Sequence, residues 1–247
     1  MSTQLGEVAI EYPESDGEPM GETDLHRDWM FDIIERLRYR YRGQRVYVSG
    51  NLFLYYQEGN PRRSVCPDAF VVKDCDPGRR RIYLLWEEEK VPNVVFETTS
   101  SSTRREDTIW KPPVYETLGV PEYFLYDPTG DYLDPALRGY RLRDAGYQLI
   151  QPDADGRLMC EQLGILLGLE AGALVMWDSV TGEELPTETE AERKAREDSE
   201  AALEASEAVL EASEAARAAA EARAGAAEAE LERFKKQLPP RSASPDV

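Results

Sequence analysis

The chain has 247 residues, which is long enough for one domain of ordinary size and an additional segment. It contains 48 acidic and 29 basic residues, so its net charge of −19 excludes a protein that is basic over its whole surface. We find no secretory signal and no run of about 18 apolar residues typical of a membrane-spanning helix.

The acidic charge is spread over the whole chain. Residues 187–247 hold 9 basic and 15 acidic residues, which leaves 20 and 33 in residues 1–186 and a net charge of −13 there. A surface that binds nucleic acid normally needs basic residues to neutralise phosphates. Arginines do gather locally, so we expect at most a basic rim on an acidic body; the clusters are Arg36, Arg38, Arg40, Arg42 and Arg45; Arg62 and Arg63; Arg79 to Arg81; Arg104 and Arg105.

The cysteines and the histidine restrict the chemistry further. Cys66, Cys75 and Cys160 are odd in number and lack metal-finger spacing, which predicts free thiols in a cytoplasmic protein. His26 is the only histidine, so most histidine-based metal chemistry is excluded. We expect His26, one position off an apolar stripe, to have a surface or packing role.

The first ordered element predicted is an amphipathic helix after an extended lead-in over residues 1–22. It begins near Thr23 or Asp24, either of which can cap it, and ends before Gly43. Its apolar residues recur at steps of three and four, as a helix with one buried face requires: Leu25, Trp29, Met30, Ile33, Ile34, Leu37 and Tyr41.

Strands follow the helix. Residues 45–48 and 52–57 have the composition of two strands, and 49–51 suit a hairpin turn between them. The apolar run 68–72 predicts a strand covered on both faces, and residues 93–99 predict another central strand. Between these two strands, residues 73–90 are a charged connection in which Glu87 to Glu89 are expected in a solvated loop.

A second helix is predicted over residues 104–118, with Ile109, Val114, Tyr115 and Leu118 on one side. A strand over 121–127 follows, and short antiparallel strands and edge elements complete the domain by residue 186. The strand–helix–strand order predicts an α/β fold in which helices flank a mixed central sheet over residues 23–186.

The last part of the chain is a different kind of segment. Residues 187–238 are mostly Ala, Glu, Arg and Ser, and the sequence at 203–208 is repeated seven residues later at 210–215. A seven-residue repeat predicts a long helix or a coiled coil. One of the two core positions of the repeat is filled mostly by small and polar residues, which bury little surface. Two alternatives therefore remain: a weak coiled coil that makes a homo-oligomer such as a dimer, or a solvated single helix. Residues 239–247 are expected to be disordered.

Three residues are candidates for a catalytic site. Asp68 starts one apolar strand and Glu97 ends another, where a buried carboxylate needs a metal or hydrogen bonds. Lys111 follows on the second helix. Carboxylate oxygens suit hard cations such as Mg²⁺, and an ammonium group can stabilise developing phosphate charge.

Each candidate also has an ordinary structural interpretation. Asp68 could be an exposed turn residue, whereas burial on a central strand favours function for Glu97. Lys111 could be a solvated helix residue, and Pro112 and Pro113 directly after it disturb a helix because proline lacks a backbone donor. Glu35 on the first helix is a weaker candidate for a further metal ligand.

These residues occur within motifs that resemble a known family. The stretch 67–72 (Pro-Asp-Ala-Phe-Val-Val) is similar to its first motif, and 94–107, from Val-Val-Phe-Glu through Thr103, Arg104 and Arg105 to Asp107, is similar to its second. The stretch 118–128 resembles the part that closes its core. The likeness, over about residues 20–160, is to the Uma-two group of restriction-endonuclease-like proteins in the PD-(D/E)XK nuclease superfamily.

The resemblance implies a restriction-endonuclease-like core and Mg²⁺-dependent hydrolysis of DNA phosphodiester bonds, with Mn²⁺ as a substitute. It implies that Asp68 and Glu97 bind the metal. The superfamily lysine two residues after the glutamate is Thr99 here, and Lys111 matches the lysine that this family carries on the following helix. The alternative function is a nuclease-like module that has lost cleavage and oligomerises through its C-terminal helix.

Overall fold

The structure is a computed structural model that describes residues 10–15 and 24–237. The chain divides into two compact units, with the boundary between Thr189 and Glu190. Thr23 and the predicted disordered segment 239–247 lie outside the described residues. Within the lead-in, Tyr12 packs on Tyr55, and the Tyr55 hydroxyl donates a 2.6 Å hydrogen bond to the carbonyl oxygen of Pro13.

A six-stranded mixed sheet forms the centre of the first unit, in the order β1-β4-β6-β7-β8-β9. Only β6 and β7 are parallel, because the helical segment between them crosses over the sheet. This confirms the predicted α/β class. The strands are β1 (Val46–Ser49), β4 (Ala69–Lys73), β6 (Val94–Thr98), β7 (Glu122–Tyr126), β8 (Leu137–Arg143) and β9 (Gly146–Leu149).

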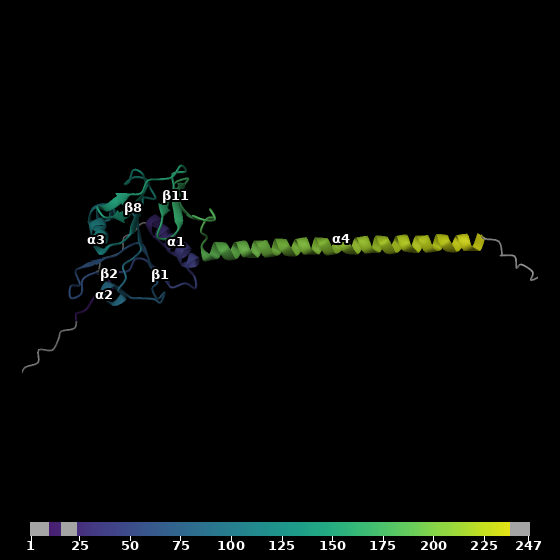
Figure 1. The fold of residues 1–247 in the computed structure, drawn as a ribbon, viewed down its shortest axis with the longest axis horizontal. Helices are drawn as coiled ribbons and strands as arrows, with labels where there is room; N and C mark the ends of the chain where they lie inside the picture. Colours follow the sequence, from purple (N-terminus) through teal and green to yellow (C-terminus); the bar gives the residue numbers. More distant parts are fainter. Residues whose placement is uncertain (1–9, 16–23, 238–247) are drawn as a thin grey trace, which may run out of the picture. The chain divides into compact units, whose positions relative to one another are not determined.

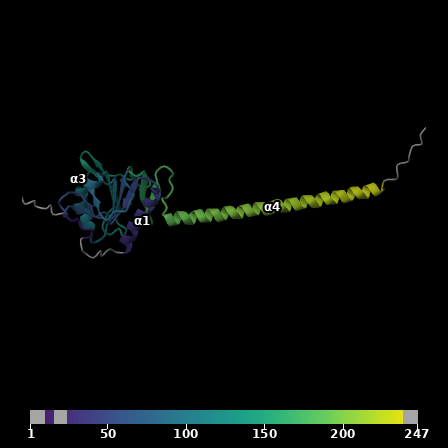
Figure 2. The same ribbon diagram turned by 90° about the horizontal axis from the view of Figure 1, so that it is seen from below.

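Helices cover the two faces of this sheet. On one face lies α1 (Asp24–Arg40), which buries His26, Met30, Ile33, Ile34 and Leu37. On the other lies α3 (Lys111–Leu118), and α1 and α3 are on opposite sides of the sheet in both views (Figures 1 and 2). Side chains alternate between the two faces along β4 and β6, so each strand supplies both hydrophobic cores.

The predicted hairpin at residues 49–51 is wrong. β1 pairs with β4, whereas β2 (Leu54–Tyr55) belongs to a separate small sheet with β3 (Ser64–Val65) and β5 (Tyr83–Leu84). The chain leaves the main sheet at Asn51, whose φ is 48° and whose N–H donates to the carbonyl oxygen of Pro67. A long-range bond therefore replaces the local turn.

The charged connection 73–90 is more ordered than predicted. It contains β5 and the short helix α2 (Leu85–Glu88). Glu88 is not a solvated loop residue, because it accepts hydrogen bonds from the Arg80 guanidinium. The Arg80 guanidinium also lies over the Tyr47 ring, so this segment is fixed to β1.

The strands after residue 157 form a third sheet rather than edges of the main one. β10 (Leu158–Cys160), β11 (Ile165–Glu170) and β12 (Ala173–Asp178) pair in that order. Their inner residues join the α1 side of the core. α1 is therefore enclosed between two sheets, and Arg40 near its C-terminal end is paired with Asp178 of β12 at 2.6 Å.

The second predicted helix consists of two segments. A π-helix, Glu106–Trp110, precedes α3, and the Lys111 N–H donates to the carbonyl of Glu106 in the five-residue spacing. The π-helix lets α3 begin at Lys111, so Pro112 and Pro113 stand in the first turn of α3, where a backbone N–H has no acceptor within the helix and its absence is tolerated. It also turns Ile109 outward to 55% exposure, so its predicted place on the apolar side is wrong.

The second unit is described by α4 (Glu188–Gln237), a continuous helix of 50 residues (Figure 2). This confirms the predicted long helix. From Glu192 onward its described side chains are exposed. Within the described residues, no helix is both long and apolar enough to cross a membrane.

Candidate active site

Strand pairing brings Asp68 and Glu97 together. In the β4–β6 register Ala69 lies opposite Phe96, so the residue before Ala69 and the residue after Phe96 are neighbours at one end of the sheet. The Asp68 N–H donates to Glu97 Oε2 at 3.2 Å. In return, Asp68 Oδ2 accepts a 2.6 Å hydrogen bond from the N–H of Thr98.

Glu97 is enclosed by α3. It lies two residues from Val95 and therefore on the same face of β6, where Tyr115 is buried. Lys111 and Tyr115 are one helical turn apart and both reach the carboxylate. Lys111 Nζ lies 2.9 Å from Oε2, and the Tyr115 hydroxyl donates to Oε1 at 2.7 Å.

Asp107 is a third carboxylate at this site, and it comes from the π-helix. Its Oδ1 lies 3.1 Å from Lys111 Nζ, and its side chain is almost fully buried. The Tyr123 hydroxyl donates to the Asp107 carbonyl oxygen at 2.5 Å and so ties the π-helix to β7. The ammonium group is thereby held between Glu97 and Asp107. In sequence, Asp107 was visible only as part of the second family motif.

His26 approaches from the opposite face of the sheet. Its Nε2 lies 3.2 Å from Asp68 Oδ2, and its side chain is 2% exposed. The sequence indicated a surface or packing role, because one helical position off a stripe does not reveal a long-range contact. Glu35, the weaker candidate ligand, is exposed on α1, and within the described residues it has no contact with Asp68 or Glu97.

A glycine permits the close packing at Asp68. A Cβ on Gly50 would lie 1.8 Å from the carbonyl oxygen of Asp68 and 2.7 Å from a methyl group of Ile34. Any side chain here would displace backbone as well as a side chain. The absence of a side chain at Gly50 therefore lets the end of β1 pack directly against the backbone of Asp68.

The site carries an excess of negative charge, and this excess affects the pKa of each buried group. Burial raises the pKa of Glu97 well above its usual range; the Lys111 ammonium opposes this, and the charges of Asp68 and Asp107 add to it. Burial also raises the pKa of Asp107. For Lys111, burial lowers the pKa, but the carboxylates of Glu97, Asp107 and Asp68 outweigh it and hold the pKa well above normal.

The residues present fit a hard divalent cation by charge and by donor chemistry. Glu97, Asp107 and Glu106 lie 2.9, 3.1 and 3.9 Å from Lys111 Nζ, and the charge of Asp68 acts on the same ammonium group, so four carboxylates surround one cation. Oxygen donors are those that Mg²⁺ prefers. In the arrangement described, Lys111 occupies the space between Glu97 and Asp107. Among the described residues, no three His, Cys, Asp or Glu side chains are already grouped as a ready metal cage.

Comparison with known proteins agrees with the motifs. Residues 3–174 match the family Uma2, described as "Putative restriction endonuclease". The chain belongs to the Uma2 family. No curated protein matches it. A crystal structure of a "putative nuclease belonging to DUF820" from Anabaena variabilis is similar, with a TM-score of 0.44 and 14% identity over 59% of this chain and 76% of that one.

Proposed function

We propose that this Uma2 chain is a Mg²⁺-dependent endonuclease that hydrolyses DNA phosphodiester bonds at Asp68, Glu97 and Lys111. The observation that carries the proposal is the convergence of the three residues at one end of the sheet, where the N–H of Asp68, directly before β4, and Nζ of Lys111 on α3 both donate to Glu97 Oε2 on β6. If the three charged residues were placed by chance, there would be no reason for two of them, Glu97 and Lys111, to be buried in contact with each other. Burial of Glu97 and Lys111 costs free energy that a solvated surface would avoid.

Asp68 and Glu97 would hold the cation, for which Mn²⁺ can substitute. When bound, such a cation supplies Lewis-acid stabilisation of the phosphate and makes a water molecule more acidic. The Tyr115 hydroxyl and the Asp68 N–H orient the Glu97 carboxylate. His26 and the Thr98 N–H orient Asp68 in the same way.

Lys111 would act as a fixed positive charge. Its ammonium group carries three donors and is held by Glu97 and Asp107. A positive charge here favours deprotonation of an attacking water and stabilises charge that develops on the phosphate oxygens. The π-helix gives this lysine its direction, because without the wide turn Pro112 and Pro113 would interrupt the helix that carries it.

Cleavage assays test the proposal. Purified protein with Mg²⁺ or Mn²⁺ is incubated with plasmid DNA and with single-stranded DNA, alongside Asp68→Asn and the control Glu87→Gln, which changes an exposed carboxylate on α2. We expect cleavage by the parent and the control only, and its loss on addition of EDTA. Intact DNA in every reaction, together with unchanged metal binding by Asp68→Asn, would reject the proposal.

A second role is proposed for α4, which is assembly of identical chains. Three leucines recur at the first position of the seven-residue repeat, and each is more than half exposed: Leu203 at 61%, Leu210 at 60% and Leu231 at 57%. A second copy of the helix would cover this row. Sedimentation of the full chain should show a larger mass than the variant Leu203→Glu/Leu210→Glu, with Val209→Glu as control. Equal masses would remove this role.

Two further properties accompany the proposal. None of Cys66, Cys75 and Cys160 forms a disulfide in the described part of the chain. Thiols that form no disulfide are typical of a reducing compartment, and we propose a cytoplasmic location. There it would meet DNA directly.

A further inference from the structure

We propose that a groove along the outer edge of β1 binds the phosphate backbone of double-stranded DNA and leads it to Asp68. This inference rests on the proposed function and names the surface that would hold its substrate. The groove is lined by basic residues, whereas the chain as a whole carries a net charge of −19. A local basic surface on such a protein needs an explanation.

The groove has a volume of about 810 Å³ and lies between the end of α1, the connection to β1, β1 itself and the loop before β5. Among the described residues no aspartate or glutamate lines it. Its basic residues come from elements far apart in sequence, which the fold gathers on one surface: Arg38, Arg42, Arg45, Arg79 and Arg80.

Three of these arginines are available for an anion. Arg38, Arg45 and Arg79 are exposed, and none of them has a carboxylate partner within the described ranges. The Arg38 Nε donates to the carbonyl oxygen of Val48 at 3.1 Å, which holds its guanidinium beside β1 and leaves its other N–H groups for a ligand. Guanidinium groups with a planar fork suit phosphate oxygens.

The other two arginines are partly neutralised and frame the groove. Arg42 forms an ion pair with Glu188 at 3.0 Å between exposed side chains, which is weak in water. Arg80 is bound to Glu88 through two nitrogens and serves to fix the loop. Positive charge in excess of these pairs therefore comes from the three unpaired arginines.

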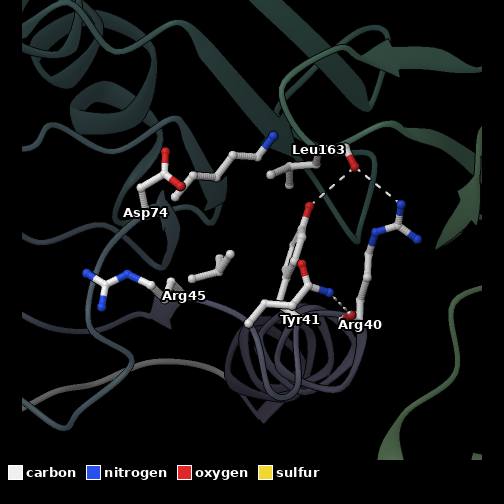
Figure 3. A pocket seen from close by; sticks show the side chains of 8 residues that line it. Arg40, Tyr41, Arg45, Asp74 and Leu163 are labelled. Atoms are coloured by element: carbon white, nitrogen blue, oxygen red, sulfur yellow. Dashed lines mark hydrogen bonds between the residues drawn. The ribbon is translucent and has the colours of Figure 1, made fainter.

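An adjacent hollow of about 570 Å³ shows the opposite arrangement (Figure 3). There Arg40 is paired with Asp178 at 2.6 Å, the Tyr41 hydroxyl donates to the carbonyl oxygen of Leu163, and Asp74 adds a negative charge. Arg45 lines both hollows and lies across from Arg40 in Figure 3. Besides the shared Arg45, the cations of the adjacent hollow are engaged within the protein, because Arg40 is paired with Asp178 and Lys73 Nζ donates to the carbonyl oxygen of Gln162. This favours the β1 groove as the anion site.

Gly50 connects the groove with the candidate active site. It lines the groove, and a Cβ there would lie 1.8 Å from the backbone carbonyl oxygen of Asp68, although Asp68 itself does not line the groove. From Val46 to Gly50 the strand advances about 13 Å at roughly 3.3 Å per residue. This corresponds to about four phosphates along one strand of a duplex, at roughly 3.4 Å of axis each. A backbone held by the arginines would therefore continue past Gly50 to Asp68.

Binding is measured apart from cleavage. Full-length protein in EDTA is titrated against a fluorescently labelled duplex and the same single strand, by anisotropy over a range of salt concentrations. The variants are Arg45→Gln, Arg79→Gln and both together; the control is Arg62→Gln/Arg63→Gln, which removes two exposed arginines outside the groove. Arg38 is left intact because it contacts β1.

We expect each groove substitution to weaken duplex binding by about tenfold at 0.1 M salt, and to lower the slope of log K against log salt by about 1. The control should match the parent, as should the melting temperatures. Duplex affinity and salt slope unchanged in the groove variants would overturn the inference, as would binding of the single strand alone or no binding by the parent. DNA binding through the groove without cleavage would instead reject the proposed function and leave the inference standing.

Discussion

Lys111 Nζ lies 2.9 Å from Glu97 Oε2, and both side chains are buried. Neither charge would be stable there alone, because transfer of an unpaired ion into the protein interior is costly. The pair is held by Asp107 on one side and by Tyr115 on the other. Under the proposed function, the contact that stabilises the buried charges is also the one that serves the reaction.

Removal of the lysine charge should have two measurable effects. Lys111→Met leaves Glu97 and Asp107 buried without their counter-charge, so we expect a loss of about 3 kcal/mol in the free energy of unfolding. The double variant Lys111→Met/Glu97→Gln should lose less than the sum of the single changes. Denaturant unfolding of the four proteins measures the coupling, and strict additivity would show that the two groups do not interact.

The same lysine substitution should separate binding from turnover. Without the ammonium group the site is more negative by one charge, so we expect Mn²⁺ to bind more tightly to Lys111→Met than to the parent. Cleavage should be abolished, because no fixed positive charge remains beside the phosphate. Tight metal binding with undiminished cleavage would remove Lys111 from the reaction.

Tyr115→Phe should weaken the site without disturbing the core. The ring remains, but Glu97 Oε1 loses its 2.7 Å hydrogen bond, which we expect to cost about 1–3 kcal/mol in unfolding free energy. Tyr140→Phe is the matched control, since in the described part of the chain no hydrogen-bond partner is found for that hydroxyl. Equal stability of the two variants would contradict this account of Glu97.

Gly50→Ala should disrupt the junction of β1 and Asp68. The added methyl group would sit 1.8 Å from a backbone oxygen, so the strand must shift, and we expect destabilisation of about 1–3 kcal/mol with a loss of cleavage. Gly225→Ala in α4 has open space around it and should instead raise helix content. Thermal unfolding and circular dichroism compare them; a Gly50→Ala protein as stable as the parent would contradict the packing described.

Asp127 provides a pH-dependent contribution to stability away from the site. Its buried carboxylate accepts hydrogen bonds from the N–H groups of Thr129, Gly130, Tyr132 and Leu133. Burial raises the pKa of Asp127, but these hydrogen bonds together lower it by more than burial raises it. The folded-state pKa is therefore below the ordinary value. The stabilisation is therefore fully present above the unfolded pKa of about 3.9 and is lost as pH falls through the folded pKa.

Asp127→Asn tests this sign. It removes the ionised acceptor, so the parent should be more stable than the variant at pH 7, and the difference should shrink as the pH falls below about 4. Denaturant unfolding at a series of pH values gives the difference directly. A constant difference across that range would show that the ionised form of Asp127 contributes nothing specific.

Much of the fold was predictable because its signals are local. The period of α1 and the apolar runs of β4 and β6 depend on neighbouring residues. Where pairing is long-range, prediction failed. The local pattern predicts the next strand in the chain as the partner of β1, whereas the structure pairs β1 with β4.

The candidate site was predictable in part for the same reason. Two of the candidates, Asp68 and Glu97, are recognisable in the sequence because a charged residue adjoins an apolar run. Lys111 is recognisable because it matches the lysine that the family carries on the following helix. His26 and Tyr115 carry no such signal, since their contacts depend on how α1 and α3 pack on the sheet. The effect of Pro112 was also not predictable, because the π-helix that accommodates it depends on packing against Tyr123.

We propose that Asp68 and Glu97 together bind a divalent cation. Titration of Mn²⁺ into the protein, followed by electron paramagnetic resonance of the free ion, measures this without DNA. We predict a saturable site in the parent and in Glu87→Gln, and an affinity at least about tenfold weaker in Asp68→Asn and Glu97→Gln. Equal Mn²⁺ affinity in all four proteins would contradict the claim.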